Sequence, residues 1–158
     1  MRERILRRET LIATIAVALT ACGQSRQQEV ADRGADVMPF DLGATTHEFT
    51  PAADGGTQTV TSDDPQAADQ VALIRDHLRA EDSAFAAGDF GDPVDIHGAD
   101  MPGVAALSAG ADRVDIAYDD IDAGARLVFT TSDPELVTAV HDWFTAQTAD
   151  HGSHAEQP

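Results

Sequence analysis

The sequence predicts an α+β fold: a two-layer sandwich in which a four-stranded antiparallel sheet is covered by two long helices and one short helix. Two pairs of short segments with strand character are each joined by a turn containing Asp and Gly, which predicts two β-hairpins. Two longer segments repeat apolar residues at helical spacing, and each follows an Asp-Pro pair, a typical helix start. Two hairpins that share one apolar face need a covering layer, which the helices supply.

The first half of the expected domain contains a hairpin followed by a long helix. "THEFT" and "TQTVTS" flank the turn "PAADGG", which predicts two antiparallel strands within residues 46–62. Asp64 and Pro65 predict the start of the helix, and Gly88 or Gly91 its end. At about 100° per residue its apolar side chains form one stripe, which consists of Ala67, Val71, Ile74, Leu78 and Phe85.

The second half repeats this order after a short helix, "PGVAALSAG", which Pro102 opens. Apolar and polar residues alternate in "DRVDIAYDD", which predicts a half-buried strand paired with "GARLVFTT". Asp133 and Pro134 predict the start of a last helix that ends near Gly152. The residues expected on its inner side are Leu136, Val140, Trp143, Phe144 and Gln147.

The beginning of the chain has the pattern of an export signal. A basic stretch followed by a short apolar one predicts a signal peptide, too short to span a bilayer core that needs ~20 residues. It ends in "LTACG", which resembles the lipobox of bacterial lipoproteins and implies cleavage before Cys22 and lipidation of its sulfur. We therefore expect a lipoprotein, anchored to the membrane on its extracytoplasmic face. The expected organisation is a signal peptide at 1–21, a flexible tether at 22–37, one domain at 38–152 and a disordered tail at 153–158.

The charge and the cysteine count limit the functions open to the chain. It has 28 acidic and 10 basic residues, and its net charge of −18 repels phosphate backbones, which disfavours nucleic-acid partners. Cys22 is the only cysteine, so its lipidation would leave no thiol for a disulfide, a metal site or a nucleophile.

Histidines at the margins of the predicted helices suggest a metal site. The turn "DIHGADMPG" places His97 four residues before Met101, and imidazole and thioether together favour copper(I). We expect His97 and Met101 to be joined by His141 and by one or both of His77 and His151. Glu81, one helical turn after His77, would orient a ligand by a hydrogen bond from outside the coordination sphere.

Other functions stay open. The histidines could be structural, in which case the chain is a metal-free interaction or accessory protein of the cell envelope. Met101 would then fill the core, and His77 would pair with Glu81 on the surface. An enzyme is the least favoured alternative, because the nearest match to a nucleophile motif, "ALSAG" around Ser108, lacks the first glycine and the preceding strand.

Four stretches carry a resemblance to a known family: "ALIRDHL", "GDFGDPVDIHGADMPG", "GARLVFTTSDPELV" and "HDWFTAQTADHG". In these stretches the chain resembles a family of small, mostly actinobacterial proteins that often bear the label aspartate carbamoyltransferase. The resemblance runs from "MPFDLGATTHEF" to "DHGSH" and implies the limits of the domain. The Ser-Thr-Arg-Thr loop that binds carbamoyl phosphate in the true enzymes does not occur in this sequence, so the resemblance does not imply their activity.

Overall fold

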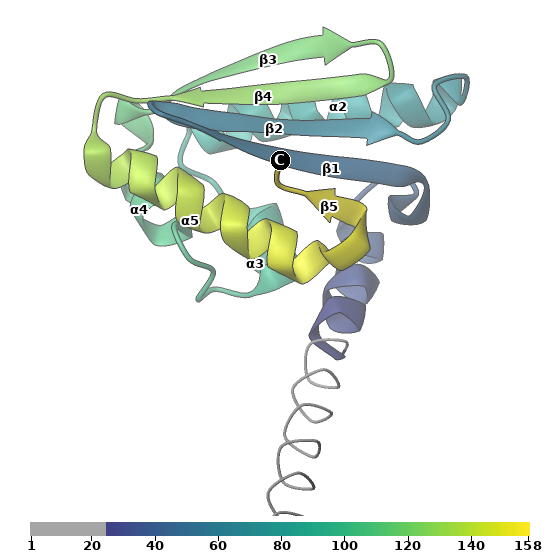
Figure 1. Ribbon diagram of the computed structural model, residues 1–158, viewed down its shortest axis with the longest axis horizontal. Helices are drawn as coiled ribbons and strands as arrows, with labels where there is room; N and C mark the ends of the chain where they lie inside the picture. The colour runs from purple at the N-terminus through teal and green to yellow at the C-terminus, as the bar shows by residue number, and fades with distance from the viewer. Residues whose placement is uncertain (1–24) are drawn as a thin grey trace, which may run out of the picture.

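The computed structural model describes residues 25–158, which form an α+β fold with one sheet (Figure 1). The α+β class is therefore confirmed, but the sheet is mixed and has five strands instead of the four antiparallel strands predicted. The sheet order is β3-β4-β2-β1-β5, in which β5 runs parallel to β1 and all other neighbours are antiparallel. The strands are β1 (Thr45–Ala52), β2 (Gly55–Ser62), β3 (Asp115–Ile121), β4 (Gly124–Thr130) and β5 (Ala155–Glu156). The helices are one over residues 25–37, then α2 (Ala68–Ala86), α3 (Gly91–His97), α4 (Val104–Ala109) and α5 (Pro134–His151), with short 3-10 turns at Leu42–Ala44, Ala111–Arg113 and Gly152–His154.

Both predicted hairpins form, and the register between them places one set of side chains under the helices. Phe49 lies opposite Gln58, which lies opposite Leu127 in β4. Phe49 and Leu127 are buried, whereas alternate residues on the other face, such as Arg126, are exposed to solvent. Because side chains alternate along a strand, one face of the sheet packs on the helices and the other stays polar.

Aromatic rings from both long helices meet the sheet in the centre of the core. Trp143 of α5 is fully buried. Its ring makes edge-to-face contacts with three phenylalanines: Phe85 of α2, Phe90 just before α3, and Phe129 of β4. Phe85 and Phe90 are stacked with their centroids 4.5 Å apart. This cluster joins α2, α5 and the sheet, as the apolar stripes predict.

Both ends of the domain differ from the expectation. The flexible tether expected at 22–37 is wrong for residues 25–37, which form a helix whose Val30 is only 1% exposed. The disordered tail expected at 153–158 is also wrong, because β5 pairs with β1 and Ala155 is buried. Neither segment has an apolar period, so their order depends on tertiary contacts that sequence patterns do not record. The expected signal peptide and Cys22 lie outside the described residues.

The helices also differ in number and limits from the prediction. The helix at 25–37 and α3 were not expected, which makes five helices in residues 25–158 instead of three. Helix α2 begins at Ala68, because the Asp64 carboxylate accepts a hydrogen bond from the Gln66 amide in a preceding turn and does not cap the helix. Asp133 does cap α5 as predicted. No helix within residues 25–158 has the length and apolar character needed to cross a membrane.

Candidate metal centre

Three side chains from α2 and α3 converge on one point and could hold a metal ion. His77 and Glu81 are one turn apart on α2, a spacing that places both on the same face of a helix. Asp92 lies in the first turn of α3. One ligand atom from each residue lies within 4.8 Å of the others, the single such group of three or more among residues 25–158. The chain reversal between α2 and α3 therefore brings one imidazole and two carboxyl groups together.

Burial sets the protonation of these groups. Burial is the main cause that raises the pKa of Glu81 to about 8, and the neighbouring charge of Asp92 and a hydrogen bond with it add to the shift. Burial also lowers the pKa of His77, although the charge of Asp92 opposes this. Without a cation, Glu81 is therefore a protonated acid beside the Asp92 carboxylate, and His77 is a neutral imidazole. A cation that displaces the Glu81 proton would find three electron-pair donors.

A small cavity of about 30 Å³ adjoins this group and continues into the interior. One water needs ~10–15 Å³ by this measure, so the cavity has room for about two or three waters. It is lined by four histidines, namely His47, His77, His97 and His151. Three polar atoms around it have no hydrogen-bond partner in the described part of the chain: His47 Nδ1, Gln58 Oε1 and Trp143 Nε1. Buried polar atoms without a partner are uncommon in folded proteins, and a bound water or ion is one common explanation for them.

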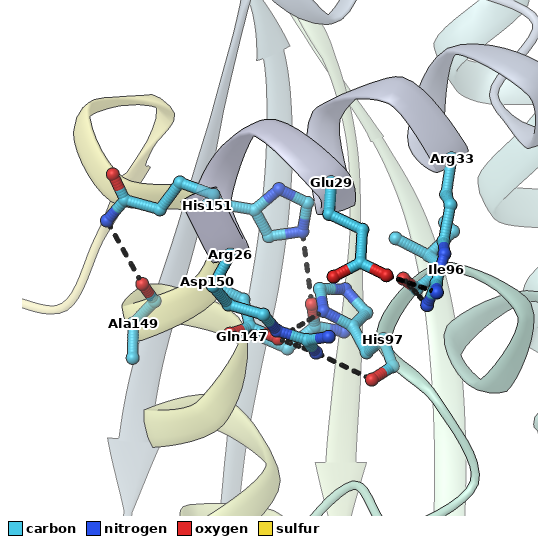
Figure 2. A network of polar contacts seen from close by, with 10 residues as sticks. Arg26, Glu29, Arg33, Ile96, His97, Gln147, Ala149, Asp150 and His151 are labelled. Atoms are coloured by element: carbon cyan, nitrogen blue, oxygen red, sulfur yellow. Dashed lines mark hydrogen bonds and ion pairs between the residues drawn. The ribbon is translucent and has the colours of Figure 1, made fainter. Parts of the chain in front are cut away.

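His97, the last residue of α3, and His151, the last residue of α5, lie together in a polar network with the helix at 25–37 (Figure 2). Their ring centroids are 4.9 Å apart. His97 Nδ1 is 2.8 Å from Asp150 Oδ2, and Arg26 donates to the same oxygen at 2.7 Å. Burial raises the pKa of Asp150, but the hydrogen bonds from Arg26 and His97 outweigh it and leave this pKa lowered. Asp150 is thus an ionised acceptor that fixes the proton of His97 on Nδ1.

His141 is directed elsewhere. Its Nε2 is 2.9 Å from the carbonyl oxygens of both Ala52 and Gly55, at the β1–β2 turn. Since both partners are acceptors, Nε2 must carry a proton and donate it, which removes this nitrogen as a ligand. The structure therefore does not bring His141 to the expected site, and its visible role is to tie α5 to the first hairpin.

Met101 belongs to the hydrophobic core. It is 7% exposed and packs within the main apolar cluster. The next glycine fixes this placement: Gly103 has φ +80°, and a Cβ there would lie 2.1 Å from the Ala139 carbonyl oxygen. The "MPG" segment thus lets α4 approach α5 closely, and Met101 fills the space beside it. Met101 does not line the cavity beside His77, Glu81 and Asp92.

Sequence analysis found two of the three converging residues but gave one of them a different role. His77 was an expected ligand, whereas Glu81 was expected outside the coordination sphere. Asp92 was missed, because α3 was not expected and an acidic residue in "GDFGDPV" looks like part of a turn. The available signal was the H-x-x-x-E spacing on an amphipathic helix that is followed at once by a short acidic segment.

The ligand set selects among metals. Imidazole nitrogen with carboxylate oxygens suits divalent ions such as Zn²⁺, Fe²⁺ and Mn²⁺, whereas copper(I) prefers sulfur. Three protein ligands also leave a position for water.

Comparisons with known proteins do not narrow the choice of metal, since no protein-family model, curated protein or solved structure matches the chain.

Proposed function

We propose that this protein is a metal-binding domain that holds one divalent ion between α2 and α3. Zn²⁺ is the representative ion of this proposal. The convergence of His77, Glu81 and Asp92 within 4.8 Å carries the proposal. Within residues 25–158 no arginine pairs with Glu81, a carboxyl that is only 8% exposed. A cation would compensate the charge that burial otherwise disfavours.

The adjoining cavity supports storage or sensing of an ion over turnover of an organic substrate. Its volume of about 30 Å³ accommodates water as a further ligand but not a metabolite. Copper(I) has less support than Zn²⁺, because Met101 packs in the core and His141 Nε2 donates to backbone carbonyls. Activity on carbamoyl phosphate has no support from this site, which offers no arginine.

Metal titration of the chelator-stripped chain tests the proposal. We expect one equivalent of Zn²⁺ to bind more tightly than micromolar, and Asp92→Asn to weaken binding at least tenfold. Asp95→Asn removes an exposed carboxylate from the same helix and should leave the affinity unchanged. Calorimetry at pH 7 in two buffers of different protonation heat should detect about one released proton, which Glu81→Gln should abolish.

A metal-free role is the second candidate, because Glu81 and Asp92 can share one proton and so satisfy each other without an ion. Absence of Zn²⁺ binding, or equal binding by Asp92→Asn, would favour it. If the chain binds Cu⁺ tightly and Met101→Leu abolishes this binding, the result would instead support the copper site predicted from the sequence.

We further propose that Cys22 carries a lipid and holds the domain on the extracytoplasmic face of the membrane. The support is the "LTACG" pattern after a basic and an apolar stretch. Growth with an alkyne fatty acid should label the chain, and Cys22→Ser should abolish the label. Equal labelling of the wild type and of Cys22→Ser would contradict this assignment.

A further inference from the structure

A second, larger cavity lies against the helix at 25–37. Its volume is about 350 Å³, within the ~300–1,000 Å³ that small-molecule pockets occupy. The helix at 25–37 supplies one wall, the segment 40–43 another, and the floor comes from β1 and the end of α5. An apolar cavity of ~150 Å³ already holds benzene, so this pocket has room for a molecule of two rings.

The lining of the pocket combines apolar side chains with a few polar groups. The apolar side chains are those of Val30, Ala31, Ala35, Phe40 and Leu42. The polar groups include the imidazoles of His47, His151 and His154. His47 and His151 are stacked, with centroids 5.3 Å apart and planes within 6°. A largely apolar pocket with a few convergent polar groups is the usual form of a small-molecule site.

The charges around the pocket favour an uncharged occupant. Burial lowers the pKa of His47 to about 4 and that of His151 to about 3, so neither ring offers a cation at neutral pH. Asp150 is already engaged by Arg26 and His97, and Asp41 accepts a hydrogen bond from the Gly43 amide. With a net charge of −18 on the chain, an anion would be repelled.

His47 provides the hydrogen-bonding group for such a ligand. Its side chain lines the pocket, the residue is 3% exposed, and its Nδ1 has no partner among residues 25–158. A neutral imidazole always has one nitrogen that accepts and one that donates. The rings of Phe40 and His151 on either side hold it in place, with centroids 6.2 and 5.3 Å from its own.

We propose that this pocket binds a small, uncharged, mostly apolar molecule of about two rings with one hydroxyl or N–H group that hydrogen-bonds to His47. The pocket does not include the three residues of the metal proposal, since none of His77, Glu81 and Asp92 lines it, although His47 and His151 line both cavities. The ligand would also stabilise the docked helix at 25–37, since that helix forms one of its walls.

Three probes with the same two-ring skeleton test the chemistry on the chelator-treated chain: 2-naphthol, naphthalene and 2-naphthoate. Equilibrium dialysis should give a micromolar dissociation constant for 2-naphthol. Naphthalene should bind roughly 3- to 10-fold more weakly, the value of one hydrogen bond, and 2-naphthoate at least tenfold more weakly. In His47→Phe, which keeps a ring, the preference for 2-naphthol over naphthalene should disappear.

A filled-pocket variant locates the binding. Ala35→Phe places a ring in the pocket from an exposed helix position, and we expect it to abolish binding of both neutral probes. Ala80→Phe makes the same change at an exposed site of α2 away from the pocket and should bind normally. Glu81→Gln should also bind normally, which separates this site from the metal site.

Three results would overturn the inference. The first is no binding of 2-naphthol up to its solubility, and the second is tighter binding of the naphthoate. The third is unchanged binding in Ala35→Phe, which would place the probe elsewhere. The ¹⁵N signals of the His47 ring should shift with 2-naphthol and not with naphthalene, and the absence of this shift would contradict the assigned hydrogen bond.

Discussion

The covered face of the sheet has two regions of opposite chemistry. In one, which we call the aromatic region, Trp143 packs against Phe85, Phe90 and Phe129. In the other, the histidine region, the rings are imidazoles, and His47 Nδ1 has no partner among residues 25–158; the region comprises His47, His77, His97 and His151. Packing explains a region of three phenyl rings and one indole better than a region of four imidazoles, because apolar rings would fill the same space with fewer buried nitrogens. The histidine region is therefore where function is to be sought.

The largest expected effect comes from the aromatic region. Trp143→Ala should lower the free energy of unfolding by about 3–5 kcal/mol, because it removes a fully buried ring and leaves a cavity between α5 and the sheet. Urea unfolding monitored by far-UV circular dichroism measures this. Leu73→Ala, at an exposed position, is the matched control and should change stability by less than about 0.5 kcal/mol.

Acid should weaken the histidine region selectively. The folded-state pKa of His47, about 4, lies below the 6.5 of the unfolded chain, so its contribution is complete above pH 6.5 and is lost as the pH falls towards 4. The loss is on the order of 2–3 kcal/mol for this group. Urea unfolding at pH 7.5 and 4.5 should give a smaller pH-dependent loss in His47→Phe than in the wild type. Equal losses would mean that His47 is not buried as a neutral ring.

Alkali should have the reverse effect through Glu81 when no metal is bound. Its folded-state pKa of about 8 exceeds the ordinary 4.5, so its contribution to stability is complete below pH 4.5 and is lost as the pH rises through 8. In EDTA at pH 8.5, Glu81→Gln should therefore be more stable than the wild type, by about 1–3 kcal/mol. Chemical denaturation at pH 6 and 8.5 measures the difference, and a Gln variant that is less stable at pH 8.5 would contradict it.

The smallest global effect is expected at the edge of the histidine region. Arg26→Ala removes the hydrogen bonds to Asp150 and to the His97 carbonyl, which hold the helix at 25–37 to the domain (Figure 2). Because Arg26 is partly exposed, we expect a loss of less than about 1 kcal/mol in global stability. Hydrogen exchange in residues 27–36 should nevertheless accelerate at least fivefold. Arg126→Ala, which breaks a surface pair with Asp119, should leave that exchange unchanged.

The two regions also differ in how well the sequence predicts them. The hairpins and the stripes of α2 and α5 were predictable, because apolar residues with a period of 2 or 3.6 must share a buried face. Trp143 and Phe85 accordingly lie where the periodicity places them. The meeting of His47 with His151 depends on β5 and on the turn after α5, which carry no periodic signal.

The candidate site was predicted in part for the same reason. The i, i+4 relation of His77 and Glu81 is local and visible in the sequence, whereas Asp92 joins them only through the reversal into α3. Met101 and His141 were misplaced because donor atoms were counted without their competing partners, namely the hydrophobic core and the β1–β2 turn carbonyls. A chemically suitable side chain becomes a ligand only when packing leaves its lone pair free.

The folding of residues 25–37 onto the domain limits the distance and orientation that the domain could take relative to a bilayer. Under the lipid-anchor proposal only residues 22–24 separate the acylated sulfur from the docked helix, a chain length that spans at most ~10 Å. The domain would then lie close to the lipid headgroups with a restricted range of orientations, instead of being connected to the membrane by a long flexible linker. Its excess of carboxylates would turn the most acidic surfaces outward, away from anionic lipid.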